Sequence, residues 1–376
     1  MSLLSNALSR DRNNFDLVRL IAAVTVVYAH SFVVQLPDGH EDPVAVLLGY
    51  DYTGSLGVFA FFLLSGLLVT ASFDRQRSAS RFVLLRASRI WPAVAAASLF
   101  AIFLMGPLVT TLPLDKYFSS FQTWSNLDSF STIVFGRRMQ LPGVFDHNRQ
   151  PYAIFGPLWT LPIEVRYYGV VLITGMLGLL KSRRAIFGAV LLGTIPFLVY
   201  PHFEPHFYVT LRNLAHKPGG YGFFPEPVFM AGMLLYAFRD RVHISGWTCV
   251  ALWCAFLVLR GTPLEYGLFY LAFGYAVLWI GTAALLHRFA PRNDYSFGIY
   301  IYGFALQQVI ACFWPHLDHM SAFLLTLPFV FACAWVSWHC VEKPALDWTR
   351  HRLARSPARS RGTTRPSDTV AEVAPR

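Results

Sequence analysis

The chain has 376 residues, of which 55% are hydrophobic and 14% are Lys, Arg, Asp or Glu. Because charged residues make up about 25% of a typical soluble domain, this composition, with a mean hydropathy of +0.44, excludes a disordered chain and argues against a water-soluble one. The formal net charge of +10 is interpreted as anchoring of cytoplasmic loops at a membrane, before nucleic-acid binding. The five cysteines have no metal-binding spacing, so we expect no metal site.

Apolar segments recur along nearly the whole chain. About ten of them approach the length that crosses a hydrocarbon core of about 30 Å, and each is expected to be a helix because backbone groups in lipid must bond within their own segment. They are 15–36, 55–73, 91–111, 161–180, 185–201, 223–239, 245–260, 265–286, 295–314 and 321–341. The predicted fold is therefore all-α, a polytopic membrane protein with about ten transmembrane helices.

Lys and Arg are unevenly distributed between the connections. If the N-terminus is cytoplasmic, most of the 31 Lys and Arg fall on the cytoplasmic side. This bias follows the positive-inside rule and predicts that both termini are cytoplasmic. Residues 1–348 are predicted to form the membrane domain, and 349–376, rich in Arg, Ser, Pro and Thr, a flexible basic tail. The outside connection 112–160 is unusually long and aromatic, which is typical of a functional loop.

His30 and Glu164 are among the ionisable residues inside predicted helices, where a charge costs about 2.5–3.5 kcal/mol. His30 follows Arg19 by eleven residues, so it lies about 16 Å farther along the first helix, in the outer half of the bilayer. Glu164 is a few residues into the fourth helix from outside, at a compatible depth. A carboxylate beside an imidazole can orient a general base. The alternatives are a core histidine bonded to a neighbouring helix and a Glu164 paired with Arg166 or with a loop residue in the headgroup region.

A pair of arginines lies at the predicted cytoplasmic membrane edge. Arg86 and Arg89 are neighbours on one helix face, and their forked donors suit phosphate. The alternative is that they only fix the topology. Ser65 and Gly66 form a small pair that lets a helix or a thin ligand arm come close. These depths indicate a long donor with a phosphate head, for which a phosphopantetheine thioester has the right anatomy.

Seven stretches of the sequence, in this order, resemble the acyltransferase-3 family of integral membrane acyltransferases over about residues 10–348. They are FDLVRLIAAVTVVYAHSF with Arg19-x10-His30, FFLLSGLLV, RFVLLRASRIWP with Arg86-x-x-Arg89, LWTLPIEVRYY, PVFMAGMLLY, YSFGIYIYGFALQQ and VEKP. Any one of them alone is a weak signal. Seven in order on a chain with about ten predicted spans form a specific one.

The resemblance implies transfer of an acyl group, often acetyl, from cytoplasmic acyl-coenzyme A to a hydroxyl. The implied acceptors are sugars of lipopolysaccharide, capsule, exopolysaccharide or glycolipid, and the implied location is the bacterial inner membrane. His30 would be the base and Glu164 its support, with no bound cofactor. The residues expected at the acyl-coenzyme A end are Arg19, Arg86, Arg89, Ser65 and Gly66. Aromatic residues that could stack on an acceptor sugar are Trp124, Trp159 and Tyr168.

A different class of function remains open from the sequence. An intramembrane His and Glu also occur in the proton relays of transporters and flippases. No inverted repeat is visible, and the charged sites converge on only three segments, which argues against that alternative. A purely structural membrane protein would not explain why an energetically unfavourable His and Glu lie inside the membrane.

Overall fold

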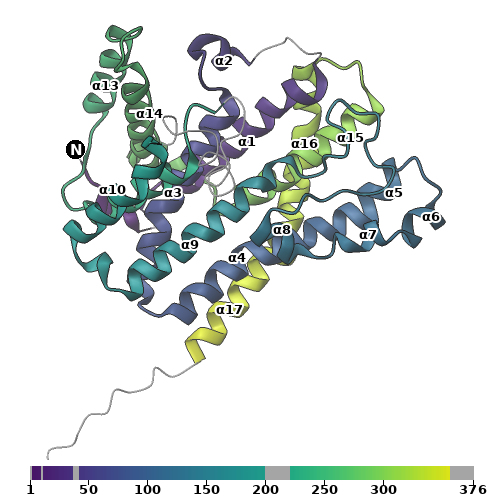
Figure 1. Cartoon of the computed structure of the whole chain (residues 1–376), viewed down its shortest axis with the longest axis horizontal. Coiled ribbons are helices and arrows are strands. Elements are labelled where there is room, and N and C mark those ends of the chain that lie inside the picture. The colour runs from purple at the N-terminus through teal and green to yellow at the C-terminus, as the bar shows by residue number, and fades with distance from the viewer. Residues whose placement is uncertain (1, 10–11, 37–41, 200–220, 356–376) are drawn as a thin grey trace, which may run out of the picture.

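The protein is described by a computed structural model that covers residues 2–9, 12–36, 42–199 and 221–355. Most of this part of the chain is helical and almost none of it is strand, as predicted (Figure 1). The two short strands, β1 (Ser2–Leu3) and β2 (His243–Ile244), pair antiparallel. They join two connections that the charge distribution assigns to the same side of the membrane.

The centre of the molecule is a group of apolar helices packed around α3 (Thr53–Gln76), the most buried of the long helices. Its neighbours are α1 (Phe15–Gln35), α12 (Pro225–Ala237) and α9 (Leu161–Met176). α15 (Ser296–Phe313) and α16 (His319–Ser337) pack on the other side of α1. Large apolar side chains from these helices pack against one another and form the core, because their burial against one another is favourable.

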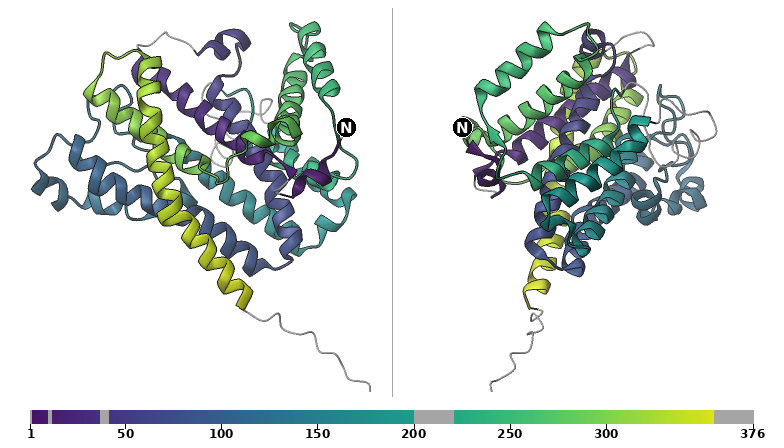
Figure 2. Two further views of the ribbon diagram at one scale, coloured as in Figure 1. Left: turned by 180° about the vertical axis from the view of Figure 1, so that it is seen from behind. Right: turned by 60° about the vertical axis from the view of Figure 1, so that its left-hand side comes forward.

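α4 (Ala79–Phe100) continues through the π-helical turn η3 (Ala101–Met105) into α5 (Gly106–Val109). α16 continues in the same way through η8 (Trp338–Glu342) into α17 (Lys343–Arg355). Figure 2 shows this second rod descending beside α4. The remaining elements are η1 (Leu4–Leu8), α2 (Pro43–Leu48), α6 (Leu114–Ser119), α7 (Phe121–Ser125), α8 (Ser129–Phe135), η4 (Gly156–Thr160), η5 (Leu179–Lys181), α10 (Arg183–Val199), α13 (Gly246–Val258), α14 (Glu265–Thr282) and η7 (Ala284–Phe289).

Five helical segments in the described ranges are long and apolar enough to cross a membrane. They are Phe15–Gln35, Thr53–Gln76, Ala79–Val109, Ser296–Phe313 and His319–Arg355. Each of the other five predicted segments also contains a helix, but these helices are shorter or less apolar. The structure therefore supports a multi-pass membrane protein, while ten spans and cytoplasmic termini stay predictions.

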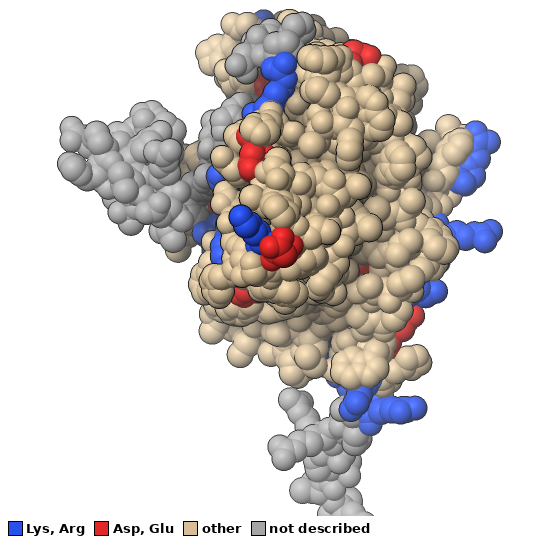
Figure 3. All heavy atoms as spheres, turned by 90° about the vertical axis from the view of Figure 1, so that its right-hand side faces the viewer, with Lys and Arg blue, Asp and Glu red and all other residues tan. Residues whose placement is uncertain are grey.

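The outer surface is suited to lipid. Large apolar side chains such as Phe121, Trp247 and Val258 are at least 80% exposed, which would be costly in water. Most of the face in Figure 3 carries no charge. A surface of this kind is expected where acyl chains, rather than water, surround the helices.

Two predicted boundaries are wrong. α4 begins at Ala79 rather than near residue 91, because Arg-containing turns continue the helix. Arg86 and Arg89 therefore lie inside this long helix, while their predicted position at the membrane edge stays a prediction. α17 extends to Arg355, so the first turns of the segment predicted to be a tail are helical and pack on α4. The rest of the predicted tail, 356–376, lies outside the described residues, as does the end of the predicted fifth segment.

The long connection 112–160 is folded, as its aromatic content predicts. Tyr117 and Phe145 in this connection are fully buried. Its helix α8 packs against α4 and α9, and the Phe130 ring lies 5.5 Å from that of Trp91. Because Trp91 is next to Arg89 and Ile90 in sequence, the connection returns along α4 to the level of the paired arginines. The last residues of the connection then run inward along α15, with Gly156 against Phe304 and Thr160 bonded to Tyr300, so α9 begins deep in the bundle.

Candidate functional site

Three arginines from two helices meet in the interior. Arg19 of α1 and Arg86 and Arg89 of α4 line a slender cavity of about 100 Å³. The same three side chains line a wider hollow of about 540 Å³, whose wall also includes Arg75 and Arg350. The arginines thus form the boundary between the hollow and the cavity. The structure therefore brings Arg19, Arg86 and Arg89 together at one cavity, while their role in binding a donor stays a prediction.

Two of these three charges are already compensated. Asp294, which precedes α15 and is buried, accepts a hydrogen bond from Arg89 Nη2. Its Oδ2 also lies 3.5 Å from Arg19 Nη1. Arg89 Nη1 is 3.9 Å from Glu342 Oε2 in η8. Burying guanidinium groups is tolerable only with such partners, so Asp294 and Glu342 allow α1, α4, α15 and η8 to meet here.

Arg86 differs from its two neighbours. It forms no ion pair in the part of the chain that the structure describes; Nη2 donates to Ser72 Oγ over 3.4 Å, and Nε is buried without a hydrogen-bond partner. Its guanidinium lies 5.8 Å from the centre of the Tyr168 ring. A half-buried cation that has no ion pair and a buried, unused donor is unfavourable by itself. Arg86 is therefore the group in this cavity best prepared to bind an anion.

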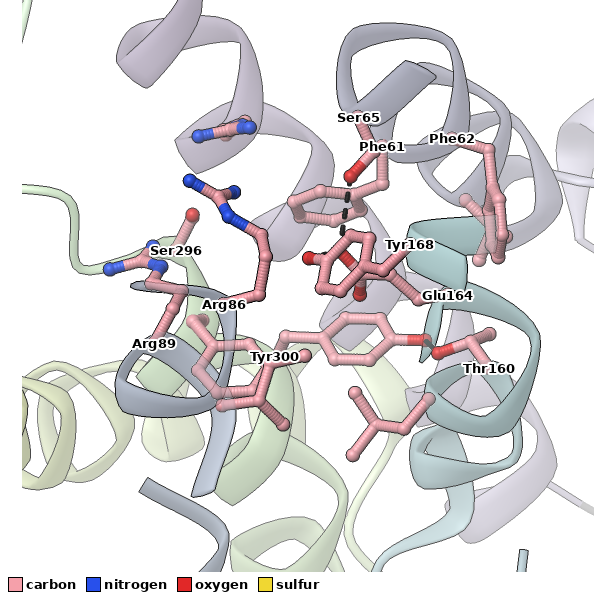
Figure 4. Close-up of a pocket in the computed structure, with 15 residues that line it drawn as sticks. Phe61, Phe62, Ser65, Arg86, Arg89, Thr160, Glu164, Tyr168, Ser296 and Tyr300 are labelled. Carbon is pink, nitrogen blue, oxygen red and sulfur yellow. Dashed lines mark hydrogen bonds between the residues drawn. The ribbon is translucent and has the colours of Figure 1, made fainter. Parts of the chain in front are cut away.

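Glu164 of α9 occupies the opposite wall of the cavity. Its Oε1 accepts hydrogen bonds from Ser65 Oγ over 3.0 Å and from the Tyr168 hydroxyl. Figure 4 shows the Glu164 carboxylate facing the guanidinium groups of Arg86 and Arg89 across the cavity. Thr160 and Tyr300, which bond to each other over 3.0 Å, also line it. The cavity therefore has a cationic side and a hydroxyl-rich side.

The predicted pairing of His30 with Glu164 is wrong. α1 and α3 are antiparallel, with Gly54 against Ala29 and Gly57 against the Ala22 carbonyl, so Ser65 lies farther down, beside the first turns of α1. Glu164, bonded to Ser65, is thus at the level of Arg19 and far below His30. The predicted depth assumed that α9 starts at the membrane surface. It starts deeper because the residues before it run inward along α15, with Gly156 against Phe304 and Thr160 bonded to Tyr300.

His30 lies instead in the seam between α1 and α15. Its ring meets the Phe304 ring edge-on at 5.1 Å. Nδ1 is buried without a hydrogen-bond partner, and His30 forms no ion pair with any residue that the structure describes. His30 is half-buried and its Nδ1 has no partner, so it is not the satisfied core histidine that we considered as an alternative. It remains available for proton transfer.

The three aromatic residues predicted to bind an acceptor do not come together. Trp124 packs on Phe103 and Phe118 at the outer connection, and Trp159 packs on Tyr221. Tyr168 lines the arginine cavity. These residues are too dispersed for one sugar site. Their common aromatic character was the sole signal, and it is equally typical of core packing.

Ser65 lines the cavity as predicted, whereas Gly66 does not. Gly66 packs on the backbone of α12 at Phe229 and Gly232, so its role is close helix packing. The sequence analysis missed Asp294, Ser72 and Tyr300. Asp294 carried one usable signal, since it directly precedes the YSFGIYIY stretch.

Replacing Gly66 with valine is expected to destabilise the protein by about 1–3 kcal/mol or more. The added side chain would collide with the α12 backbone rather than with a movable side chain. The measurement is the unfolding midpoint of detergent-solubilised protein. Gly188→Ala in α10 is the control, because no atom lies near its Cβ position and alanine favours a helix. Equal midpoints for the two variants would contradict the close packing of α3 on α12.

Comparisons with known proteins assign the chain to a family. A family described as an acyltransferase domain, acyltransferase-3, matches residues 12–339. The chain is 28% identical to a protein named O-acetyl transferase of Shigella phage Sf6 over 362 residues, covering 91% of this chain and 98% of that protein. It is 27% identical to Nodulation protein 10 of Rhizobium leguminosarum bv. viciae over 381 residues, covering 92% and 96%. No solved structure matches the chain.

The matched region lies within the predicted membrane domain 1–348, whose ends stay a prediction. It includes all three arginines, Glu164 and His30. The extent of the match and the multi-pass helical fold confirm the resemblance found from the sequence. The chain belongs to the acyltransferase-3 family of integral membrane acyltransferases.

Proposed function

We propose that this protein is an O-acyltransferase of the bacterial inner membrane, with both termini in the cytoplasm. It transfers an acyl group, and first of all acetyl, from cytoplasmic acyl-coenzyme A to a hydroxyl of a sugar. The sugar belongs to a cell-surface polysaccharide, a lipopolysaccharide or a glycolipid. Family membership and the name of the phage relative, O-acetyl transferase, support the O-acyl chemistry. The donor, the acceptor and the residue roles are the proposal.

The observation that carries the proposal is the arginine boundary between a wide hollow and a slender cavity. Acyl-coenzyme A has a bulky nucleotide head with phosphates and a thin arm that ends in the thioester. The hollow of about 540 Å³ suits the head, and the cavity of about 100 Å³ suits the tip of the arm. Because Asp294 compensates Arg19 and Arg89, Arg86 is the expected phosphate ligand.

The direction of the cavity also fits a donor that spans the bundle. Its lining follows α3 from Ser65 to Val58, about two helical turns or 10 Å. Val58 adjoins Gly57, which packs against Ala22 and Val26 of α1. His30 is one further turn along α1. If Arg86 binds the phosphates of acyl-coenzyme A, the arm that carries the thioester is thus directed toward His30.

In the proposed reaction His30 removes the proton of the acceptor hydroxyl as the oxygen attacks the thioester carbonyl. The new C–O bond forms, the C–S bond breaks, and the thiolate takes up the proton from the imidazolium. The ester and free coenzyme A leave. Glu164, held by Ser65 and Tyr168, fixes the wall of the donor cavity and does not orient His30.

Isotope transfer tests the proposed activity. Purified protein in vesicles is given radiolabelled acetyl-coenzyme A, with cell-envelope extract as the acceptor pool. The expected result is label in a glycan or lipid fraction with release of free coenzyme A. A proton-dependent flux of glycolipid without consumption of the thioester, from acetyl or longer acyl donors, would contradict the proposal and favour a transporter or flippase.

Arg86→Gln is expected to raise the KM for acetyl-coenzyme A about 10- to 100-fold. A charge-assisted hydrogen bond to phosphate contributes about 1.5–3 kcal/mol, whereas removing the uncompensated guanidinium should leave the unfolding midpoint close to its original value. Arg288→Gln is the control, because Arg288 is exposed and does not line the hollow. If Arg86→Gln left the KM unchanged, Arg86 would not be the phosphate ligand.

A further inference from the structure

His30 and Gln307 lie at the same level of two parallel helices in contact. Gly303 of α15 packs against Val27 of α1, and near the ends of both helices Gln35 Nε2 donates to the Trp314 carbonyl over 3.4 Å. This alignment puts Gln307 beside the turn that contains His30. In agreement, Gln307 Nε2 donates to the Val27 carbonyl over 2.7 Å, one turn before His30.

One buried atom on each of these side chains has no hydrogen-bond partner. They are His30 Nδ1 and Gln307 Oε1, and Gln307 is only 2% exposed. An unsatisfied buried polar atom costs about 1–3 kcal/mol. Because Nε2 is engaged by the Val27 carbonyl, the amide orientation is fixed and Oε1 is an acceptor. An imidazole Nδ1–H is the donor that complements it.

No carboxylate of the described residues forms a hydrogen bond or an ion pair with His30. Glu164 is bonded at the arginine cavity. The ionisable groups on the neighbouring elements are His319, whose ring contacts Phe32, and Asp146, His147 and Arg149 in the loop that Gln308 holds. None of these forms a hydrogen bond or ion pair with His30 in the described part of the molecule.

We propose that Gln307 is the positioning residue of His30: its Oε1 accepts the Nδ1–H of the imidazole, which leaves Nε2 as the base. The inference rests on the proposed role of His30. The two atoms are not bonded in the structure, so a rotation of one side chain, or one water between them, closes the gap during the reaction. Fixing the tautomer in this way selects which nitrogen receives the acceptor proton.

The two ends of the amide allow a sharp test. Gln307→Met removes both the Val27 bond and the acceptor oxygen, whereas Gln307→Glu keeps an acceptor oxygen. We expect Gln307→Met to lower kcat about tenfold or more with little change in KM for either substrate. Gln307→Glu should recover most of that loss. A purely structural role through the Val27 bond predicts no recovery, because the carboxylate lacks the N–H donor.

Gln308 provides the matched control. It is equally buried, but its Nε2 donates to the Ala153 carbonyl over 2.9 Å and Asn148 Nδ2 donates to its Oε1 over 3.1 Å. Gln308→Met and Gln308→Glu should lower stability without the selective recovery of kcat by glutamate. Equal kcat values for folded Gln307→Met and Gln307→Glu would overturn the proposal.

A second measurement is informative even if the Gln307 variants do not fold. Wild-type protein labelled with ¹⁵N-histidine gives imidazole nitrogen resonances, and those missing in His30→Gln belong to His30. The proposal expects the Nδ1–H tautomer, and the Nε2–H tautomer would overturn it. Full activity of His30→Gln would contradict the proposed function of His30 itself. Loss of activity in His30→Gln together with the Nε2–H tautomer in the wild type would contradict only the role of Gln307.

Discussion

Replacing His30 with alanine is expected to lower acyl transfer by about 10²–10⁴-fold while the protein stays folded. A positioned general base contributes about this much to a reaction rate, and the only ring contact that the structure gives His30 among described residues is with Phe304. The loss should appear in kcat and not in the KM for acetyl-coenzyme A, because the arginine cavity is separate from His30. The measurement is label transfer from radiolabelled acetyl-coenzyme A in vesicles.

His316→Ala is the matched histidine control. His316 is exposed in the turn between α15 and α16, near the level at which α1 ends. It lines neither the hollow nor the cavity. Its replacement should leave transfer near the wild-type rate. Undiminished transfer by folded His30→Ala protein would rule out His30 as the base.

Replacing Asp294 with asparagine is expected to have the largest effect on stability. The change removes the anion shared by Arg19 and Arg89, each of which has a side chain about 20% exposed, while Asp294 is 7% exposed. Breaking a buried pair by removing one partner costs about 3–5 kcal/mol because the other charge stays buried. The unfolding midpoint in detergent should fall by about ten degrees.

The control for Asp294 is Asp347→Asn. Asp347 pairs with Arg350 at 3.3 Å, but both side chains are well exposed, and surface ion pairs contribute about 0–1 kcal/mol. Its unfolding midpoint should stay within a few degrees of the wild-type value. If Asp294→Asn behaved like Asp347→Asn, the arginine boundary would not depend on Asp294.

The local sequence around Arg86 and Arg89 predicts their position on the helix but not their different environments. Arg86 and Arg89 recur at a spacing that puts them on one helix face, so the sequence alone was enough to predict that they act together. It did not separate their roles, because the difference comes from Asp294, a residue 205 positions away. Arg86 stays uncompensated since no carboxylate of another described helix reaches it.

The error with Glu164 has a similar origin. Counting residues from a helix end gives the depth of a side chain only if every helix starts at the same plane. α9 starts deeper, because the residues before it run inward along α15, from Gln308 past Phe304 to Tyr300. The hydrogen bond from Ser65, 99 residues away, then fixes Glu164 at the arginine cavity and not at His30.

The sequence by itself determined the membrane class, the helical nature of the apolar segments, the family and the residues that carry charge in the interior. These follow from composition, periodicity and motif order, which are properties of short stretches. Only the tertiary structure decided which of those residues meet, since the offset between helices depends on packing contacts such as Gly57 on Ala22 and Gly303 on Val27. Close backbone approach at such small residues sets the level of every side chain on both helices, and no single segment contains that information.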